Sequence, residues 1–265
     1  MSFTGFLNDL EHEAAETVEY YLVVGEQRVA LNRFLGQSIE IRYLGEKACC
    51  VCGRKANKLF NNGYCYPCFT TLAECDLCIV KPHQCHHHLG TCRDNQFAEE
   101  HCMTPHYVYL ALSSGVKVGI TRKSRGKARW IDQGAVEAIP IAEVPTRKLA
   151  GELEVLISEQ IPDKTNWRKM LSGQIEAVDL LEIRRQVLAS LPAGYESYLL
   201  EEQAVYQFAY PMLETLDKIT SFSFDKQDSV AGRLIGIKGQ YLIFEDGVLN
   251  VKKHAGYKVN LVLPE

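Results

Sequence analysis

The sequence predicts an α+β fold, with β-rich segments at both ends of the chain and helices between them. Residues 17–45 and 220–263 are rich in β-branched and aromatic residues that partly alternate with polar ones, as in strands. Residues 146–161 repeat apolar positions every three or four residues, which is typical of an amphipathic helix. The remaining segments are assigned from turns, breaks and composition.

We divide the chain into four segments. They are an N-terminal β segment (1–48), a Cys/His segment (49–105), a central α/β domain (106–172), and a helical linker with a C-terminal β segment (173–265). The two end segments resemble each other, because LNRFLGQSIEIRYL and LNVKKHAGYKVNLVL both run from Leu-Asn through a glycine turn to an alternating strand. This similarity predicts two small β units that pack together.

The elements of the central and linker segments follow from local patterns. HYVYLALSSGVKVGIT predicts a hairpin over residues 106–121, followed by a short helix and a strand. The helix over 146–161 has Thr146 as its predicted N-cap. Residues 174–219 are predicted to be helical, with a break at Pro192.

The composition is that of a soluble globular protein. The 265 residues carry a net charge of −4, with 46% hydrophobic and 23% charged residues, which excludes intrinsic disorder. No apolar run approaches the ~18 residues that a membrane span requires, and the acidic N-terminus does not resemble a secretion signal. We therefore expect a cytoplasmic protein that does not enter a membrane.

The ten cysteines are the most informative feature, because all of them lie between Cys49 and Cys102. A secreted disulfide scaffold would spread its cysteines over the fold, and a packed core would scatter them singly. Neither pattern explains this concentration. The cysteines therefore predict metal binding.

Cys49-x2-Cys52 and Cys65-x2-Cys68 have the spacing of a zinc ribbon, in which two tight turns supply four thiolates to one Zn²⁺. Gly53 allows the positive φ that the first turn needs. Cys50 is a bystander or an alternative ligand. A closed site with four protein ligands leaves no position for substrate, so this zinc is predicted to be structural.

A second structural zinc site is predicted in the rest of the Cys/His segment. The favoured ligands are Cys78, Cys85, Cys92 and Cys102. Cys75 or one of the nearby histidines could replace any of these four. The spacing alone does not decide between these sets.

Residues 106–172 form a basic region with a net charge of +4 in an otherwise acidic chain. Between Lys117 and Arg129 there are six cations and no acid, namely Lys117, Arg122, Lys123, Arg125, Lys127 and Arg129. Cations beside an aromatic residue suit a phosphate-bearing ligand, and Trp130 follows the cluster directly. Trp167 and Arg168 are further candidates for contact with nucleic acid, either DNA or RNA.

The hairpin sequence resembles the opening of GIY-YIG nucleases. Tyr107-Val108-Tyr109 stands at the first motif and Lys117-Val118-Gly119 at the second. The family then has an arginine, a metal-binding glutamate and an asparagine, and the residues at these positions are Arg129 or Arg125, Glu154 and Asn166. Glu152 is an alternative to Glu154 on spacing, and Asn166 could instead cap a helix.

The resemblance implies metal-dependent cleavage of phosphodiester bonds. A tyrosine (Tyr107 or Tyr109) would activate water, Glu154 would hold Mg²⁺ or Mn²⁺, and Arg129 would stabilise the developing charge. The family's second tyrosine is Lys117 here, and the glycine of its first motif is Tyr107. Lys117 could still bind phosphate, so the domain is expected to be either an active nuclease or a degenerate relative.

The whole chain also resembles an uncharacterised bacterial family that combines a metal-ribbon segment with the strings KVGITR, RWIDQGA, DKTNWRKML and GIKGQYLIF. That second resemblance implies no activity. The functional hypothesis is a zinc-containing nucleic-acid-binding protein that could cleave its ligand. The alternatives are an inactive RNA- or ribosome-associated module and an RNA-modifying enzyme.

Overall fold

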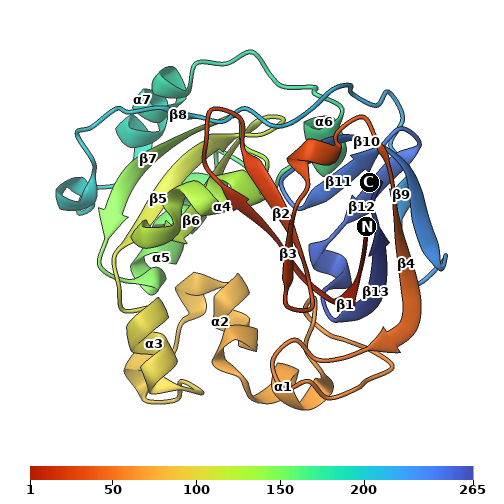
Figure 1. Cartoon of the computed structure of the whole chain (residues 1–265). Helices are drawn as coiled ribbons and strands as arrows, with labels where there is room; N and C mark the ends of the chain where they lie inside the picture. Colours follow the sequence, from red (N-terminus) through yellow and green to blue (C-terminus); the bar gives the residue numbers. More distant parts are fainter. Residues whose placement is uncertain (265) are drawn as a thin grey trace. The chain divides into compact units, whose positions relative to one another are not determined.

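The strands of the chain form two sheets, and each sheet belongs to one of two units (Figure 1). The computed structural model describes residues 1–264. Unit 1 combines Met1–Thr70 with the chain from Ala209 onward, and unit 2 is Thr71–Phe208. The predicted Cys/His segment is therefore divided, because its first five cysteines, up to Cys68, belong to unit 1 and the other five, from Cys75 onward, to unit 2.

Unit 1 contains a nine-stranded sheet in the order β3-β2-β1-β13-β4-β10-β11-β12-β9. Neighbouring strands are antiparallel except β12 and β9, which are parallel. The strands are β1 (Ser2–Glu13), β2 (Glu19–Val24), β3 (Gln27–Ala30), β4 (Ser38–Lys47), β9 (Ser221–Phe222), β10 (Ser229–Lys238), β11 (Tyr241–Phe244), β12 (Gly247–Asn250) and β13 (Tyr257–Val262). Both ends of the chain thus contribute to the centre of one sheet.

Strands β1–β4 and β10–β13 repeat one arrangement, which is a long strand, a hairpin, a 3-10 turn and a final strand. The two turns, η1 (Asn32–Phe34) and η7 (Lys252–His254), are each followed by a left-handed glycine, Gly36 at φ +80° and Gly256 at φ +83°. The first strand of each copy pairs with the last strand of the other, β1 with β13 and β10 with β4. The predicted pairing of two similar end segments is confirmed as an interleaved structural repeat.

The strand β1 did not emerge from the sequence pattern. Its register on β2 shifts between Leu7 and Leu10, both of which are buried. A bulge inserts an extra residue and interrupts the two-residue alternation by which a strand is recognised. Pairing with β13 supplies the hydrogen bonds that this irregular strand requires.

Unit 2 contains an antiparallel sheet in the order β6-β5-β7-β8. Its strands are β5 (His106–Leu112), β6 (Val116–Arg122), β7 (Glu137–Val144) and β8 (Tyr206–Gln207). The predicted hairpin is the β5–β6 pair, and the predicted strand after it is β7. In the register of the hairpin, Tyr109 lies opposite Gly119 and Ala111 opposite Lys117.

Short helices surround this sheet. After α1 (Tyr66–Thr71), the cysteine-rich part of unit 2 contains η2 (Ala73–Cys75), α2 (Leu77–Val80), η3 (Pro82–Gln84), η4 (His87–Leu89) and α3 (Asn95–His101). The later helices are η5 (Lys123–Arg125), α4 (Gly126–Asp132), α5 (Arg147–Ser158), α6 (Trp167–Leu171), α7 (Leu180–Ser190) and η6 (Glu196–Tyr198). No helix within residues 1–264 is long and apolar enough to cross a membrane.

The two faces of the unit 2 sheet are covered differently. Val108 and Leu110 of β5 pack in one core with Leu153 of α5 and Val187 of α7. On the other face, Tyr109 and Ala111 pack with Trp130 of α4. Alternation along β5 therefore directs Tyr109 to the face that does not carry α5 and α7.

The helix predictions have mixed outcomes. The predicted helix over 146–161 is α5, and the Thr146 side chain accepts a hydrogen bond from the backbone N–H of Leu149, as an N-cap does. Of the predicted helical stretch 174–219, only α7 and the single turn η6 are helical. The later residues are extended because their N–H groups bond to strands; the N–H of Leu200, for example, donates to the carbonyl of Ile141 at 3.0 Å.

Candidate functional site

Four cysteines of unit 1 form a compact thiol cluster. The sulfur atoms of Cys49, Cys52, Cys65 and Cys68 all lie within 4.8 Å of one another, and those of Cys52 and Cys65 are 3.6 Å apart. A tetrahedral zinc with Zn–S bonds of about 2.3 Å requires sulfurs about 3.8 Å apart. The cluster therefore fits the predicted zinc ligands, and it could hold a zinc ion.

The local sequence explains this geometry. Gly53 has φ +69°, and its N–H donates to the carbonyl of Cys49 at 3.0 Å, which closes the first turn. Between the two pairs, the chain reverses at Asn61 and Asn62, which both have positive φ. The bystander Cys50 is not part of the cluster, since its sulfur lies against Gly63.

The environment of Cys49 favours its thiolate form, whereas burial and the neighbouring thiols raise the pKa of Cys68. Burial of the Cys49 thiol opposes ionisation, but hydrogen bonds from the backbone N–H groups of Cys52, Cys65 and Val51 outweigh burial and lower the pKa to about 6. A thiolate is the form that binds zinc. The folded backbone thus stabilises the required state of at least one ligand.

The four cysteines favoured for a second zinc site come together in unit 2. Cys78, Cys85, Cys92 and Cys102 all line one small cavity of about 10 Å³. They are less closely grouped than the unit 1 thiols. A tighter group nearby consists of one ligand atom each from Asp76, Cys78 and His86.

Unit 2 also contains a partly buried ionic cluster, which we call the Lys117 cluster. Its members are Tyr109 of β5, Lys117 of β6, Arg129 of α4, Glu154 of α5 and Asp163 from the loop after α5. The charges of Lys117, Arg129 and Glu154 act on one another, and Asp163 acts on both Lys117 and Glu154. The structure thus brings four residues together that the sequence analysis singled out, and adds Asp163.

Tyr109 is fully buried at the base of this cluster. Its hydroxyl donates to Gln133 Oε1 at 2.8 Å and accepts a hydrogen bond from Arg129. The side chain lies across Gly119, where a Cβ atom would be 2.6 Å from the hydroxyl oxygen. Gly119 is therefore required for the position of Tyr109, and Tyr109 in turn holds Arg129.

Lys117 is an unusual lysine because only 5% of it is exposed. Burial, followed by repulsion from Arg129, lowers its pKa from 10.5 to about 7, against the opposing effect of Asp163 and Glu154. A substantial fraction of Lys117 is consequently uncharged at neutral pH. Such a lysine can accept a proton, whereas an ordinary surface lysine cannot.

The pKa of Glu154 is shifted in the opposite direction, upward. Burial, followed by repulsion from Asp163, raises its pKa from 4.5 to about 7, although Arg147, Arg129 and Lys117 act to lower it. The rival residue Glu152 lies on the same helix and approaches Lys148 at 4.0 Å. The structure therefore places Glu154, and not Glu152, in the cluster.

Asp163 was not identified as a site residue from the sequence, although it begins the string DKTNWRKML. The loop that carries it follows the outer edge of the sheet, since the N–H of Val118 donates to the carbonyl of Pro162 at 3.0 Å. This contact places Asp163 beside Lys117. Gln133, which lies in the string RWIDQGA, and Arg147, which lies in none of the quoted strings, were also missed.

Several predicted site residues lie outside the Lys117 cluster and make structural contacts. Asn166 caps α6, with its side chain accepting from the backbone N–H of Lys169 at 3.2 Å. Trp130 is 2% exposed and packs in the core, so its ring is not open to a base. Tyr107 is half-buried on β5, and the Trp167 ring is covered by the guanidinium of Arg168 at 4.3 Å.

The exposed cations near the cluster are partly compensated. Lys123 pairs with Glu143 at 2.8 Å, and Arg125 approaches Asp132 at 3.9 Å. Lys127 lies 5.5 Å from the centroid of a tyrosine ring, and Arg122 is half-buried. Arg129, by contrast, is exposed to solvent while bonded to Tyr109. It is therefore the cation best placed to contact a ligand at the cluster.

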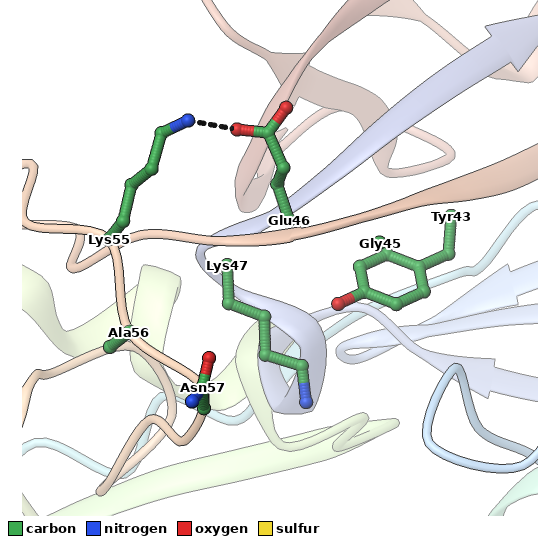
Figure 2. Close-up of a pocket in the computed structure, with 7 residues that line it drawn as sticks. All are labelled: Tyr43, Gly45, Glu46, Lys47, Lys55, Ala56 and Asn57. Carbon is green, nitrogen blue, oxygen red and sulfur yellow. Dashed lines mark ion pairs between the residues drawn. The ribbon is translucent and has the colours of Figure 1, made fainter.

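Unit 1 contains a larger hollow of about 520 Å³ at the end of β4, but its charges are paired (Figure 2). Glu46 accepts from Lys55 and from Lys258, each at 2.7 Å, and these bonds lower its pKa to about 2. Lys47 points away from this pair and bonds to Asp225 at 2.7 Å. The hollow thus lacks an uncompensated charge for a ligand.

The comparison with known families gives one match. The sequence pattern of the family described as "Protein of unknown function (DUF2797)" matches residues 36–259. The chain belongs to this family. No curated protein and no solved structure matches it. The DUF2797 match covers most of both units, including the unit 1 thiol cluster and the Lys117 cluster.

Proposed function

We propose that this DUF2797 protein binds nucleic acid through backbone phosphates at the Lys117 cluster and, with Mg²⁺ or Mn²⁺, cleaves phosphodiester bonds as GIY-YIG nucleases do. The observation that supports the proposal is the convergence of Tyr109, Lys117, Arg129 and Glu154 from separate elements. They follow one another along the chain in the order that the GIY-YIG resemblance implies. Perturbed titratable groups gathered in one place are typical of reactive sites.

The cluster contains oxygen ligands suited to a divalent cation. Glu154 and Asp163 are close enough to repel each other, and that repulsion contributes to the raised pKa of Glu154. Two carboxylates of this kind suit Mg²⁺ or Mn²⁺, which prefer oxygen ligands. When bound, the cation would polarise a phosphate oxygen and stabilise the charge that develops there.

Two basic side chains of the cluster, Arg129 and Lys117, would act at the same phosphate group. Arg129 presents an exposed guanidinium that can bind two phosphate oxygens, and its contact with Tyr109 fixes its orientation. Neutral Lys117 would accept a proton from the attacking water, whose oxygen forms the new bond to phosphorus. The P–O bond to the leaving nucleotide breaks, and the leaving oxygen takes a proton from solvent.

A binding module without catalysis is the second candidate, and two observations favour it. Tyr109 is fully buried and bonded to Gln133, so it does not reach a water molecule. Lys117 stands where the family has its second tyrosine. In this version the cluster binds RNA or DNA phosphate and leaves the strand intact.

We also propose that the unit 1 thiol cluster binds a zinc ion. We propose a cytoplasmic location for the protein, where its free thiols stay reduced.

Binding is tested by titrating the full-length protein with fluorescent single- and double-stranded DNA and RNA at several salt concentrations. Arg129→Ala should weaken binding and reduce the slope of log K against log salt by about one, because one phosphate contact is lost. Lys148→Ala is a matched control on α5, since Lys148 lies outside the cluster. Unchanged binding in Arg129→Ala at low salt would contradict the proposed site.

Cleavage is tested by incubating the same substrates with Mg²⁺ or Mn²⁺ and the protein or its variants. Glu154→Gln should reduce the rate by about 10²- to 10³-fold, as loss of a charge-stabilising group does. Glu152→Gln is the matched control on the same helix and should cleave normally. Equal rates in both variants would refute the role of Glu154, and binding without cleavage by the wild type would favour the second candidate.

A further inference from the structure

The cysteine-rich part of unit 2 has too little apolar core to hold itself together. Its longest helix, α3, has seven residues. The buried apolar side chains within residues 71–105 are Ala73, Pro82, Ala98 and the two cysteines Cys85 and Cys102. Segments of this size normally depend on cross-links or metals, because the binding energy of the metal becomes folding energy.

Four cysteines of this segment line a single small cavity. Cys78 of α2, Cys85 after η3, Cys92 after η4 and Cys102 after α3 all line a cavity of about 10 Å³, roughly the space of one water-sized sphere. The four residues come from four successive turns of the chain. One ion at the centre would therefore connect every turn of the segment.

We propose that Cys78, Cys85, Cys92 and Cys102 bind a second structural Zn²⁺ in unit 2. The four thiols close on the ion when it binds, which brings their sulfurs nearer than they lie in the structure. The sequence had left Cys75 and the histidines as alternative ligands. The cavity narrows these alternatives, because Cys75 does not line it, whereas His87 lines it together with the four cysteines.

Two arginines near the cavity would compensate the charge of four zinc-bound thiolates. A zinc ion with four thiolates has a net charge of −2, which requires compensation. Arg147 is largely buried beside Cys102 and Cys78, and its Nη2 donates to the carbonyl of Ile79 at 2.7 Å. Its Nε is buried without a hydrogen-bond partner, and Arg122 also acts on Cys102. Two cations thus face the sulfurs from β6 and α5.

The competing ligand set, Asp76, Cys78 and His86, is explained by other bonds. The carboxylate of Asp76 pairs with Arg93 Nε at 2.8 Å, and His86 Nδ1 bonds to the hydroxyl of Thr91 at 2.8 Å. Asp76 and His86 also approach each other at 3.6 Å. These contacts form a network beside Cys78, and its polar groups are satisfied without a metal.

The zinc centre would also position α5. Pro82 and His83 of η3 lie so close to Gly151 that a Cβ atom there would be 2.5 Å from Pro82. Gly151 is one turn before Glu154 on α5, and the N–H of Arg147 donates to the carbonyl of Cys102 at 2.8 Å. The centre therefore supports the start of the helix that carries Glu154. This consequence rests on the proposed function, whereas the metal site itself does not.

The test is the zinc content of the purified full-length protein, measured by atomic emission. The wild type should contain two zinc ions per chain, and Cys85→Ser or Cys102→Ser should contain one. Cys75→Ser, Asp76→Asn and His86→Gln are matched controls that should keep two. A wild type with one zinc, or loss of a zinc in Asp76→Asn, would overturn the proposal.

Cadmium NMR of the metal-exchanged wild type keeps the proposal testable if the cysteine variants do not fold. Two resonances, both with chemical shifts of four-sulfur coordination, are expected. A single four-sulfur resonance would refute the second centre. Two zinc ions in a protein that binds no nucleic acid would refute the proposed function and leave the metal site intact.

Discussion

Two glutamates, one in each unit, lie among lysines and arginines but have opposite properties. Glu46 of unit 1 accepts hydrogen bonds from Lys258 and Lys55, which lower its pKa to about 2; Figure 2 shows the pair with Lys55. Glu154 of unit 2 is buried and repelled by Asp163, which raise its pKa to about 7. The difference arises because a solvated carboxylate keeps its hydration while it gains direct partners, whereas a buried one loses hydration first.

This contrast distinguishes an ion pair that stabilises the fold from a site that could take part in binding or reaction. The unit 1 pairs leave no charge for a ligand, although their hollow is larger. In the Lys117 cluster, Lys117 and Glu154 both have pKa values near 7, so both change protonation near neutral pH. Buried groups with strongly shifted pKa values lower the stability of the fold, and they are typical of sites that bind or react.

The broadest expected effect comes from Gly119→Ala, which removes the space for Tyr109 and should therefore reduce both stability and ligand binding. The new Cβ would be 2.6 Å from the hydroxyl oxygen and 2.7 Å from Cζ of a fully buried ring. We expect unit 2 to lose about 1–3 kcal/mol of stability and the cluster to lose ligand binding. Urea denaturation and nucleic-acid titration measure the two effects.

Gly126→Ala is the control for this change. Its Cβ would be 3.4 Å from the nearest atom, in the Trp130 ring, and alanine favours the start of α4. Its effect on stability should be small. If Gly119→Ala were as stable as Gly126→Ala and still bound nucleic acid, the assigned role of Tyr109 would be wrong.

The second effect is a gain in stability for Glu154→Gln that grows with pH. The folded-state pKa of Glu154 is raised, so the stability contributed by its protonated form is present below pH 4.5 and is lost as the pH rises through about 7. Glutamine does not ionise, and the variant should therefore exceed the wild type by about 2–3 kcal/mol at pH 8–9. Urea unfolding at several pH values measures the difference.

Lys117→Met should give the opposite pH dependence. The lowered pKa of Lys117 means that its contribution is present above pH 10.5 and is lost as the pH falls through about 7. This variant should exceed the wild type below pH 6 and lose the advantage at alkaline pH. If the stability of both variants relative to the wild type changed with pH in the same direction, burial would not be what shifts the pKa values of Lys117 and Glu154.

The smallest effect is expected for Glu46→Gln in unit 1. The lowered pKa of Glu46 means that its ion pairs stabilise the fold above pH 4.5 and that this contribution is lost as the pH falls through about 2. The variant should be slightly less stable than the wild type at pH 7, and added salt should remove the difference. A gain in stability at pH 7 would show that the two glutamates do not differ as described.

Features set by neighbouring residues were predictable from the sequence. The spacing of Cys49, Cys52, Cys65 and Cys68 predicted the thiol cluster, because a two-residue gap and Gly53 determine the turn. The hairpin of β5 and β6 and the Thr146 cap of α5 were predictable for the same reason. The helical prediction beyond Pro192 was wrong because sheet edges bind that backbone.

The sequence by itself determined the locally encoded elements, such as the β5–β6 hairpin and α5, and the residues able to bind metal or phosphate. Only the tertiary structure decided which of them meet. It placed Asp163 beside Lys117, separated Glu154 from Glu152, buried Trp130 in the core and joined β1 to β13. The physical reason is that turns and caps depend on local bonds, whereas burial and long-range charge contacts exist only after the chain has packed.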